Sequence, residues 1–463
     1  MLDATACHAA VRSRDSRFDG VFYTGVKTTG IYCRPICPAR TPKAENCTFF
    51  DTAAAAEAAG FRPCLRCRPE LSPVAREANG TIARRFVHDV QLDGLFGERL
   101  ETAAARLGVS SRHLRRAVEQ ECGVSPFAVV ETTRLLFARR LLSTTTLPIS
   151  EIGFGSGFGS LARFNQSFRA RYGIAPGAFR RETQKRPRRG LRLTLAYREP
   201  FAWEALLAYW RKRAIPGVEA VADGRYWRTV RIGDRSGWFS AGPARDGVLQ
   251  VEVSDELATH LLPLAGRIRE MFDLDANPAP IRAVLEADPA MRPLVEKTPG
   301  LRVPGAFDAF ELAVRAILGQ QVTVAAATTL AGRLVERFAA SAGDLPAGLT
   351  HYPLAAKALA EASVAEIGAI GIPRKRAETL QALAQAVARG DFDFSRVTEI
   401  RGIGEWTRDY IAMRVLRWPD AFPAGDLGLR RALTSLGADA ERWRPWRAYG
   451  AIHLWTSLTE GKV

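Results

Sequence analysis

Two short cysteine pairs near the start of the chain constrain its fold more than any other feature. Three residues separate Cys33 from Cys37, two separate Cys64 from Cys67, and 26 residues lie between the pairs. Each short loop can present two thiolates to one side of a metal ion, so the pairs match a tetrahedral four-cysteine zinc site. A small segment with little apolar material can fold around such an ion. We therefore predict one zinc ion held by these four cysteines.

The positions of the other cysteines also favour a metal site over disulfides. All seven cysteines lie within the first 122 residues, and a chain in a reducing compartment uses such a cluster for metal binding or reactive thiols. Cys7, Cys47 and Cys122 fall outside the two pairs and are interpreted as packing residues.

Length and composition indicate a multidomain globular protein. The chain has 463 residues, and at roughly 150 residues per domain this suggests about three domains. Hydrophobic residues make up 47% and charged residues 25%, which excludes wholesale disorder. No run approaches the ~20 consecutive apolar residues of a membrane span, and the first residues lack a signal-peptide pattern. A cytoplasmic location is expected.

The charge is strongly positive and unevenly distributed. The net charge is +16 and the pI is about 10.0. Residues 1–190 contain 30 basic and 17 acidic residues, a net charge of +13, whereas residues 191–463 contain 35 and 32, a net charge of +3. Such an excess favours a polyanionic partner, and nucleic acid is the leading one. An anionic membrane surface is the alternative, but the sequence has no evident basic amphipathic anchor.

Composition changes along the chain divide it into five segments. We expect a small zinc domain, an all-α domain, a basic linker, a small α+β sheet domain and a second all-α domain. The fold class is then mainly α with α+β parts. Strands are expected within 191–197, 226–232 and 247–254, with a helix at 203–214. The segment KRPRRG is interpreted as a linker, because its charged side chains and its Pro and Gly residues make it unsuitable for a buried core. The five segments are, in order, 1–78, 79–184, 185–190, 191–265 and 266–463.

The segment 79–184 contains two related helical units. The motif CGVSP (122–126) corresponds to YGIAP (172–176), and each follows a basic amphipathic stretch. Each unit should form a helix, a turn and a second helix. In the first unit, Ser110 or Ser111 can cap the second helix. Basic and amide side chains on the second helices suit base edges, since Arg pairs with guanine and Asn or Gln with adenine. These candidates are Arg112, Arg115 and Arg116 in the first unit and Arg163, Asn165 and Gln166 in the second.

A tight glycine turn near the C-terminus is the third motif. Gly402-Ile403-Gly404 opens an apolar helix, and the backbone N–H groups of such a hairpin can hold a DNA phosphate. Asp426 follows 22 residues after Gly404 and directly precedes LGLRRAL, so it also fits a helix N-cap. Both interpretations of Asp426, a catalytic carboxylate and a cap, stay open on the residues alone.

The first cysteine region resembles a known repair domain. TTGIYCRPICPAR (28–40) and GFRPCLRCRPE (60–70) are similar to the N-terminal domain of Ada-type DNA methylphosphotriester repair proteins. The resemblance implies that Cys33 is both a zinc ligand and the nucleophile that takes a methyl group from an alkylated backbone phosphate. Methylation of one thiolate removes one negative charge near the DNA, so repair can act as a damage-dependent switch. The resemblance also implies DNA-backbone contacts by Thr29, Arg40 and Arg62.

The helical segment resembles a regulator domain. Residues 80–182, including FGSLARFNQSFRARYGIAPGAFR (158–180), are similar to AraC-type DNA-binding domains. This resemblance implies a transcription activator, with RNA polymerase as its partner when it activates, or at least a sequence-specific binder of double-stranded DNA. We expect a monomer associated with the nucleoid.

The last 270 or so residues resemble a DNA glycosylase. Residues 191–463, including AFELAVRAILGQQVTVAAATTLAGRL (309–334), are similar to AlkA-type 3-methyladenine DNA glycosylase II of the helix-hairpin-helix class. The resemblance implies hydrolysis of the N-glycosidic bond of alkylated bases, with Asp426 stabilising positive charge on the sugar. Gln320 and Gln321 match the loop at the flipped base, and Gln321 stands where relatives place a leucine wedge. Trp406, Tyr410 and Trp455 would line the base pocket, where aromatic faces attract cationic bases.

Residues and motifs that the sequence lacks restrict the kinds of repair reaction to be expected. Lyase-active relatives have a lysine where Trp406 stands, and no lysine occurs between Lys375 and Lys462, so a monofunctional glycosylase is expected. No cysteine follows position 122, which excludes a cysteine-ligated iron–sulfur cluster in residues 191–463. No Pro-Cys-His-Arg motif for guanine repair is present. By family analogy, the carbonyls of Thr398, Ile400 and Ile403 would hold a monovalent cation.

Two alternatives remain at this stage. One is a metal-stapled transcription factor with a catalytically degenerate glycosylase domain, against which Asp426 and the aromatic residues argue. The other is an oxidised-purine glycosylase lyase, which the missing lysine disfavours.

Overall fold

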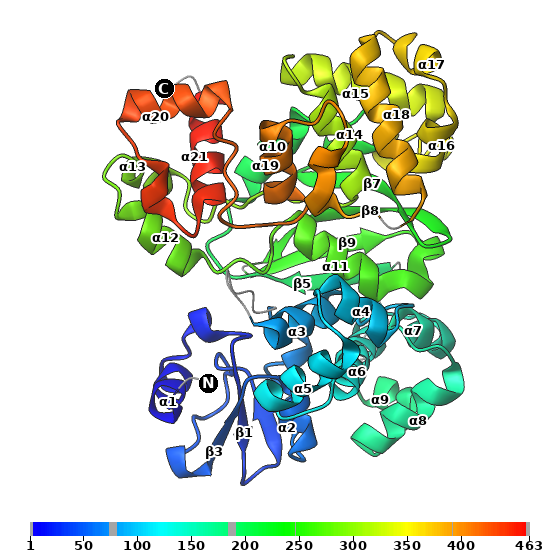
Figure 1. The fold of residues 1–463 in the computed structure, drawn as a ribbon. Coiled ribbons are helices and arrows are strands. Elements are labelled where there is room, and N and C mark those ends of the chain that lie inside the picture. The colour runs from blue at the N-terminus through cyan, green and yellow to red at the C-terminus, as the bar shows by residue number, and fades with distance from the viewer. Residues whose placement is uncertain (1–2, 74–80, 184–190, 246, 391, 460–463) are drawn as a thin grey trace. The chain divides into compact units, whose positions relative to one another are not determined.

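The computed structural model describes residues 3–73, 81–183, 191–245, 247–390 and 392–459, and the chain divides into two compact units (Figure 1). Unit 1 comprises Met1–Arg198, Ala244–Arg269 and Leu274–Asn277, and unit 2 comprises Glu199–Pro243, Glu270–Asp273 and Pro278–Val463. The basic linker predicted at 185–190 lies outside the described residues. Within the ranges just given, no helix combines the length and apolar character needed to cross a bilayer.

The N-terminal part of unit 1 is a small sheet with two helices. The sheet order is β3-β1-β2-β4, in which β1 pairs antiparallel with β2 and β3, and β2 pairs parallel with β4. Its core is small and includes Cys7 and Phe22 in one cluster and Tyr23 and Tyr32 in another. The elements are α1 (Ala4–Ser13), β1 (Tyr23–Val26), β2 (Ile31–Cys33), β3 (Cys47–Phe50), α2 (Ala53–Ala58) and β4 (Arg62–Pro63).

Seven helices lie within the described residues 81–183, and among them α4–α5 and α7–α8 correspond to the two predicted helical units. Ser110 caps α5 by accepting the His113 N–H, and Ser160 caps α8 by accepting the Arg163 N–H. The cap expected at Ser110 or Ser111 is therefore Ser110. The helices are α3 (Ile82–Asp93), α4 (Leu100–Arg106), α5 (Ser111–Cys122), α6 (Pro126–Thr144), α7 (Ile149–Gly155), α8 (Leu161–Tyr172) and α9 (Pro176–Thr183).

Both units contain strands from the region after the linker. In unit 1, β5 (Leu191–Ala196) pairs antiparallel with β9 (Val248–Val253). In unit 2, β7 (Arg225–Ile232) pairs antiparallel with β6 (Glu219–Ala222) and β8 (Arg235–Arg245). The three predicted strands are present as β5, β7 and β9. The sequence did not indicate β8, because RSGWFSAGPAR is rich in Gly, Ser and Pro, and its pairing with β7 holds it in place.

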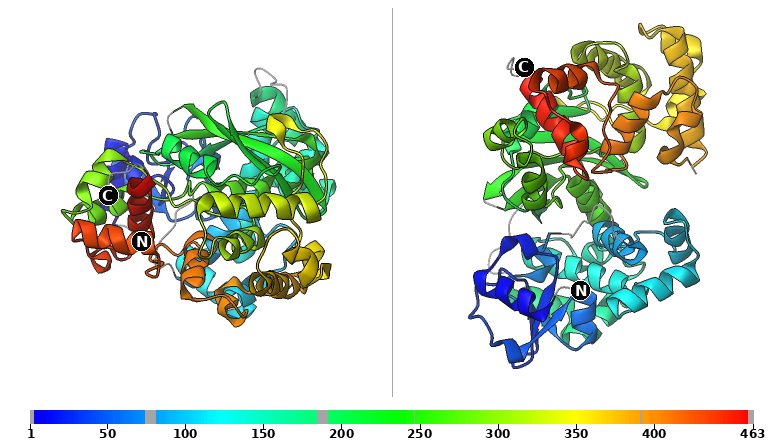
Figure 2. Two further views of the ribbon diagram at one scale, coloured as in Figure 1. Left: turned by 90° about the horizontal axis from the view of Figure 1, so that it is seen from above. Right: turned by 60° about the vertical axis from the view of Figure 1, so that its left-hand side comes forward.

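The rest of unit 2 is helical, as predicted. A core of buried Leu, Ile, Val and Ala residues joins α14, α15 and α18, and α20 packs beside α21 (Figures 1 and 2). Helix α11 (Leu261–Met271) crosses the boundary between the two units in the sequence. The other helices are α10 (Trp203–Arg211), α12 (Pro278–Glu286), α13 (Arg292–Lys297), α14 (Ala309–Leu318), α15 (Val324–Phe338), α16 (Ala356–Glu361), α17 (Val364–Gly368), α18 (Arg374–Ala388), α19 (Glu405–Arg414), α20 (Leu427–Leu436) and α21 (Arg447–Thr459).

Candidate functional site

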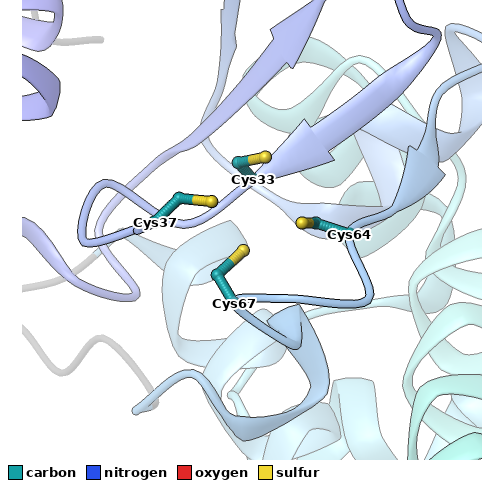
Figure 3. Close-up of side chains that lie close together, drawn as sticks. All are labelled: Cys33, Cys37, Cys64 and Cys67. Atoms are coloured by element: carbon teal, nitrogen blue, oxygen red, sulfur yellow. The ribbon is translucent and has the colours of Figure 1, made fainter. Parts of the chain in front are cut away.

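The four paired cysteines converge at the ends of two adjacent strands. The parallel pairing of β2 with β4 aligns Tyr32 with Pro63, so Cys33, the last residue of β2, and Cys64, the first residue after β4, lie at the same end of the two strands. Cys37 and Cys67 return to the same place from the loops that follow, and all four side chains point toward one another (Figure 3). The four Sγ atoms lie within 4.8 Å of one another.

This cluster fits a single zinc ion. Tetrahedral Zn–S bonds of about 2.3 Å place the sulfur atoms roughly 3.8 Å apart, which is within the observed separation limit. Two backbone amides support the negative charge of thiolates: the Arg34 N–H donates to Cys67 Sγ at 3.3 Å, and the Arg66 N–H donates to Cys64 Sγ at 3.4 Å. The chemistry of the donor set therefore matches the metal.

Cys33 differs from its three partners in accessibility. Cys37, Cys64 and Cys67 are 9%, 6% and 7% exposed, whereas Cys33 is only half-buried. The loop after Cys33 is anchored by the buried side chain of Arg34, which forms an ion pair with Asp19. Cys33 is the most exposed residue of the four.

Two of the three residues predicted to contact the DNA backbone lie at the same end of the small sheet, opposite the cysteine cluster along β2 and β4. Thr29 is exposed in the turn between β1 and β2, where its Oγ1 donates to the Val26 carbonyl. The Arg62 N–H donates to the Gly30 carbonyl at 2.8 Å, so the exposed Arg62 side chain begins beside that turn. Arg40 is also exposed, in the loop that follows Cys37.

The second helices of the two helical units present most of their predicted base-contacting residues to solvent. Arg112, Arg115 and Arg116 are exposed on α5. On α8, Arg163 and Gln166 are exposed but Asn165 is half-buried.

The glycine hairpin in unit 2 requires Gly402 for two reasons. Its φ is +93°, and a Cβ at this position would lie 2.1 Å from the Thr379 Oγ1. The Gln320 Nε2 donates to the Gly402 carbonyl and to the Thr407 Oγ1, both at 3.1 Å, so Gln320 braces the hairpin. Gly404 is the N-cap of α19, and its N-terminal amides lack a side-chain cap. The neighbouring Gln321 is exposed and adopts φ +55°.

Asp426 lies at the meeting point of three elements. Its Oδ2 accepts a hydrogen bond from Trp406 Nε1, and its Oδ1 accepts one from Trp455 Nε1, both at 3.2 Å. Oδ1 also accepts the Leu429 N–H at 2.9 Å, so the N-cap interpretation is correct as far as it goes. The two indole N–H groups come from α19 and α21, so side chains from two other helices also hold this carboxylate. Asp426 is half-buried, which leaves part of it facing solvent.

The three predicted pocket aromatics are brought together around this carboxylate. Trp406 and Tyr410 stack with centroids 5.3 Å apart and an interplanar angle of 12°, and Tyr410 meets Trp455 edge-on at 6.2 Å. All three residues are half-buried. Electron-rich faces arranged beside a carboxylate suit a planar cationic ligand.

Two residues behind Tyr410 were not anticipated from the sequence. The Tyr209 hydroxyl lies 3.2 Å from the Tyr410 hydroxyl, and the buried Arg414 donates to both. Burial alone raises the pKa of Tyr410, but the charge of Arg414, aided by Arg213, lowers it below its ordinary value. The only sequence signal was the i, i+4 spacing of Tyr410 and Arg414 on α19 and of Tyr209 and Arg213 at α10.

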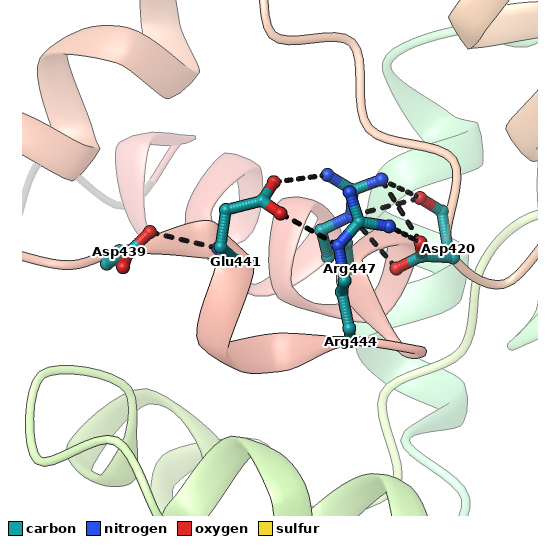
Figure 4. A network of polar contacts seen from close by, with 5 residues as sticks. All are labelled: Asp420, Asp439, Glu441, Arg444 and Arg447. Atoms are coloured by element: carbon teal, nitrogen blue, oxygen red, sulfur yellow. Dashed lines mark hydrogen bonds and ion pairs between the residues drawn. The ribbon is translucent and has the colours of Figure 1, made fainter.

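A surface network fixes the loop that leads to Asp426 (Figure 4). Arg447, the first residue of α21, donates from Nε to Asp420 Oδ1 at 2.9 Å and from Nη1 to Glu441 Oε1 at 2.6 Å. Arg444 also bonds Asp420 and Glu441. Asp420 precedes Asp426 in the loop, and Trp455 lies further along α21. The network therefore ties the segment that carries the carboxylate to the helix that carries one of its partners.

Four family models match the chain in the order of these features. "Metal binding domain of Ada" matches residues 6–70, "Helix-turn-helix domain" 103–182, "AlkA N-terminal domain" 192–308, and "HhH-GPD superfamily base excision DNA repair protein" 314–446. With the geometry of the cluster, the first match supports a zinc ion held by Cys33, Cys37, Cys64 and Cys67.

Known proteins resemble the chain over nearly its whole length or over unit 2. It is 40% identical to a "Probable bifunctional transcriptional activator/DNA repair enzyme AlkA" of Mycobacterium tuberculosis, over 98% of this chain and 97% of that protein. It is 34% identical to "DNA-3-methyladenine glycosylase 2" of Escherichia coli, over 58% of this chain and 97% of that protein. A solved 3-methyladenine DNA-glycosylase from Archaeoglobus fulgidus aligns with a TM-score of 0.52 at 21% identity, covering 58% of this chain and 100% of that one, a likeness of fold alone.

Proposed function

Because the chain belongs to the family of bifunctional transcriptional activators and DNA repair enzymes that join an Ada-type metal-binding domain to an AlkA-type glycosylase, we propose that it repairs alkylated double-stranded DNA by two reactions and regulates transcription through the first. It transfers a methyl group from a DNA methylphosphotriester irreversibly to Cys33. It also hydrolyses the N-glycosidic bond of alkylated bases such as 3-methyladenine, with Asp426 as the catalytic carboxylate. In this proposal, residues 1–78 carry out methyl transfer, residues 79–184 bind DNA for regulation, residues 185–190 link the two halves, and residues 191–265 and 266–463 form the glycosylase.

The methyl-transfer reaction rests on Cys33, the most exposed residue of the cysteine cluster. Zinc held by four cysteines keeps its thiolates deprotonated at neutral pH. The Cys33 Sγ attacks the methyl carbon, so an S–C bond forms while the C–O bond breaks with its electron pair left on the phosphate oxygen. The triester becomes an ordinary phosphodiester, and Thr29, Arg40 and Arg62 hold the neighbouring backbone. A thioether does not return the methyl group, so each molecule reacts once.

Methylation then favours DNA binding by the two helical units. Loss of one negative charge at the cysteine cluster weakens repulsion of phosphates. The exposed Arg112, Arg115 and Arg116 on α5 and Arg163 and Gln166 on α8 read base edges, with Asn165 at the margin of that surface. The bound protein, a monomer, contacts RNA polymerase to activate transcription. It acts in the cytoplasm on nucleoid DNA, where reducing conditions keep its thiols available for metal.

The glycosylase reaction rests on one observation, the two indole N–H groups that converge on Asp426. They orient the carboxylate beside Trp406, Tyr410 and Trp455, whose ring faces receive the flipped base. The bond between the sugar C1′ and the base nitrogen breaks with its electron pair leaving on the base. Asp426 stabilises the resulting positive charge and orients the water whose oxygen bonds to C1′ while one proton of that water passes to the solvent.

The hairpin positions the DNA for this reaction. The amides at Gly402 and Gly404 bind a backbone phosphate, while Gln320 braces the turn from behind. Gln321, exposed at the adjoining turn, lies at the gap left by the flipped base. The carbonyls of Thr398, Ile400 and Ile403 hold a monovalent cation in support of the same phosphate. Since the chain lacks the lyase lysine, the reaction stops at base release.

One experiment tests both reactions. The protein is incubated with methylated duplex DNA, Cys33 is examined by mass spectrometry, and released bases are separated by chromatography. We expect one methyl group on Cys33 together with free 3-methyladenine, and Cys33→Ala should lose methyl transfer but keep base release. A methyl group found on Cys64 or Cys67 would identify a different nucleophile. Methyl transfer without any base release would instead favour the degenerate-glycosylase alternative.

A further inference from the structure

Glu57 is a buried carboxylate that the proposed reactions do not use. It is the one charged residue in the alanine-rich stretch TAAAAEAAG (52–60), and its side chain on α2 is 0% exposed. A carboxylate removed from water in this way must be compensated by hydrogen bonds or an opposite charge. Its partners therefore indicate why a charge is kept at this position.

The three partners of Glu57 come from three different elements. The Tyr32 hydroxyl donates to Oε1 at 3.0 Å, and the Thr132 hydroxyl donates to Oε2 at 3.4 Å. The guanidinium of Arg171 forms an ion pair with Oε2 and also donates to the Thr132 hydroxyl at 3.1 Å. Tyr32 belongs to β2, Thr132 to α6 and Arg171 to α8.

These partners connect the methyl acceptor to a DNA-reading helix. Tyr32 directly precedes Cys33, and Arg171 lies in the last turn of α8, which carries Arg163 and Gln166. Tyr32 is 0% exposed and packs edge-on against Tyr23 with ring centroids 5.7 Å apart, so its hydroxyl moves with its strand. The connection from Cys33 to α8 therefore consists of one peptide bond, one enclosed ring and one carboxylate.

A second set of contacts keeps α6 against the same cysteine cluster. Arg68, next to Cys67, donates to the Ser143 hydroxyl at 2.8 Å. Arg139 donates to the carbonyl of Pro63, next to Cys64, at 3.4 Å. These two contacts join α6 to residues next to Cys64 and Cys67, so α6 is packed against the same end of the small sheet that carries the cysteine cluster.

We propose that Glu57 is a positioning residue that couples methylation of Cys33 to the orientation of α8, an inference that rests on the proposed methyl transfer. A methyl group on Cys33 Sγ adds volume at the end of β2 and removes one charge from the cluster. Tyr32 then shifts with its strand, the Tyr32–Glu57 hydrogen bond readjusts, and the ion pair with Arg171 changes the position of α8. The gain in DNA affinity on methylation thus has a structural part in addition to the electrostatic part.

The test measures how much methylation improves DNA binding in matched variants. Tyr32→Phe removes only the hydroxyl that donates to Glu57, and Glu57→Gln removes the charge but keeps the shape. Glu131→Gln is the control, because Glu131 contacts only the α8 side of this network: it pairs with Arg163 and Arg171, each at 3.6 Å, and accepts from Ser167 at 2.7 Å. Its change in basal DNA affinity is measured separately from the methylation gain. Each full-length protein is measured before and after reaction with methylated DNA. The probe is a duplex selected from a random-sequence pool by the methylated wild-type protein.

Coupling between two sites in proteins is typically about 5- to 150-fold, and loss of one hydrogen bond changes an equilibrium by roughly 2- to 10-fold. We expect Tyr32→Phe and Glu57→Gln each to reduce the methylation gain by about 3- to 10-fold, the double variant to add little, and Glu131→Gln to keep the wild-type gain. Zinc content and the yield of methylated Cys33 should match wild type in Tyr32→Phe, which separates coupling from misfolding.

An undiminished gain in both Tyr32→Phe and Glu57→Gln would overturn the inference and leave the electrostatic switch as the whole explanation. An equal reduction in Glu131→Gln would also overturn it, because the effect would then belong to the helical segment alone. If the wild-type protein accepts no methyl group at all, the proposed methyl transfer fails, and the coupling fails with it.

Discussion

Replacing Asp426 by Asn removes the charge of the carboxylate with almost no change in shape. The Asn oxygen, placed as Oδ1, can still accept from Leu429 N–H and Trp455 Nε1. Its NH₂ group then faces the Trp406 Nε1–H, which is donor against donor, so one of the three hydrogen bonds is lost. Loss of a hydrogen bond to a charged group costs about 1.5–3 kcal/mol, and the free energy of unfolding should fall by that amount.

The effect on catalysis should be larger than the effect on stability. Two unit charges about 4 Å apart interact by about 4 kcal/mol at an effective dielectric constant of ~20. The positive charge on the sugar exists mainly in the transition state, so most of this energy is lost from the barrier alone. At 1.36 kcal/mol per factor of ten, the rate of base release should fall by about 10³.

The assay is release of 3-methyladenine from methylated duplex DNA under single-turnover conditions, with DNA affinity and unfolding measured in parallel. Asp409→Asn is the matched control, because it makes the same substitution on α19 at a carboxylate that forms an ion pair with Arg408. The control should keep the wild-type rate. If Asp426→Asn also releases base at the wild-type rate, the carboxylate is only a helix cap and the catalytic assignment is lost.

Three further predictions concern other parts of the chain. Elemental analysis should find one zinc ion per molecule, and substitution of Cys37, Cys64 or Cys67 by Ser should release it and unfold the N-terminal domain; a folded, reduced wild-type sample without zinc would contradict this. Trp455→Ala should slow release of the cationic 3-methyladenine more than release of neutral damaged bases, a selectivity that parallel release assays compare directly. Burial lowers the pKa of His453 to about 4 from 6.5. The unfolded chain therefore binds a proton below about pH 6.5 that the folded chain does not, and unfolding becomes easier by up to about 3 kcal/mol as the pH falls to 4. Urea unfolding of His453→Gln should lack this part of the pH dependence.

Short-range patterns made much of this architecture predictable. The spacing of Cys33, Cys37, Cys64 and Cys67 predicts a shared metal, because each short pair can present two thiolates to one ion and two such pairs complete a tetrahedral site. The two helical units followed from apolar periodicity and a serine cap, which depend on neighbours three or four residues away. The strand β8 did not follow, since its residues favour turns and only pairing with β7 makes it a strand.

What only the tertiary structure decided is which side chains meet. The sequence determined that Asp426 precedes a helix and that Trp406, Tyr410 and Trp455 exist, but not that both indoles donate to that carboxylate across 20 and 29 residues. The contact of Arg414 with Tyr209 spans 205 residues, and that of Arg171 with Glu57 spans 114. Such contacts leave no periodic signal, because each depends on the path of the whole intervening chain. The physical reason is that secondary structure and metal ligation are set by local geometry, whereas a buried polar contact is set by close packing of elements distant in sequence.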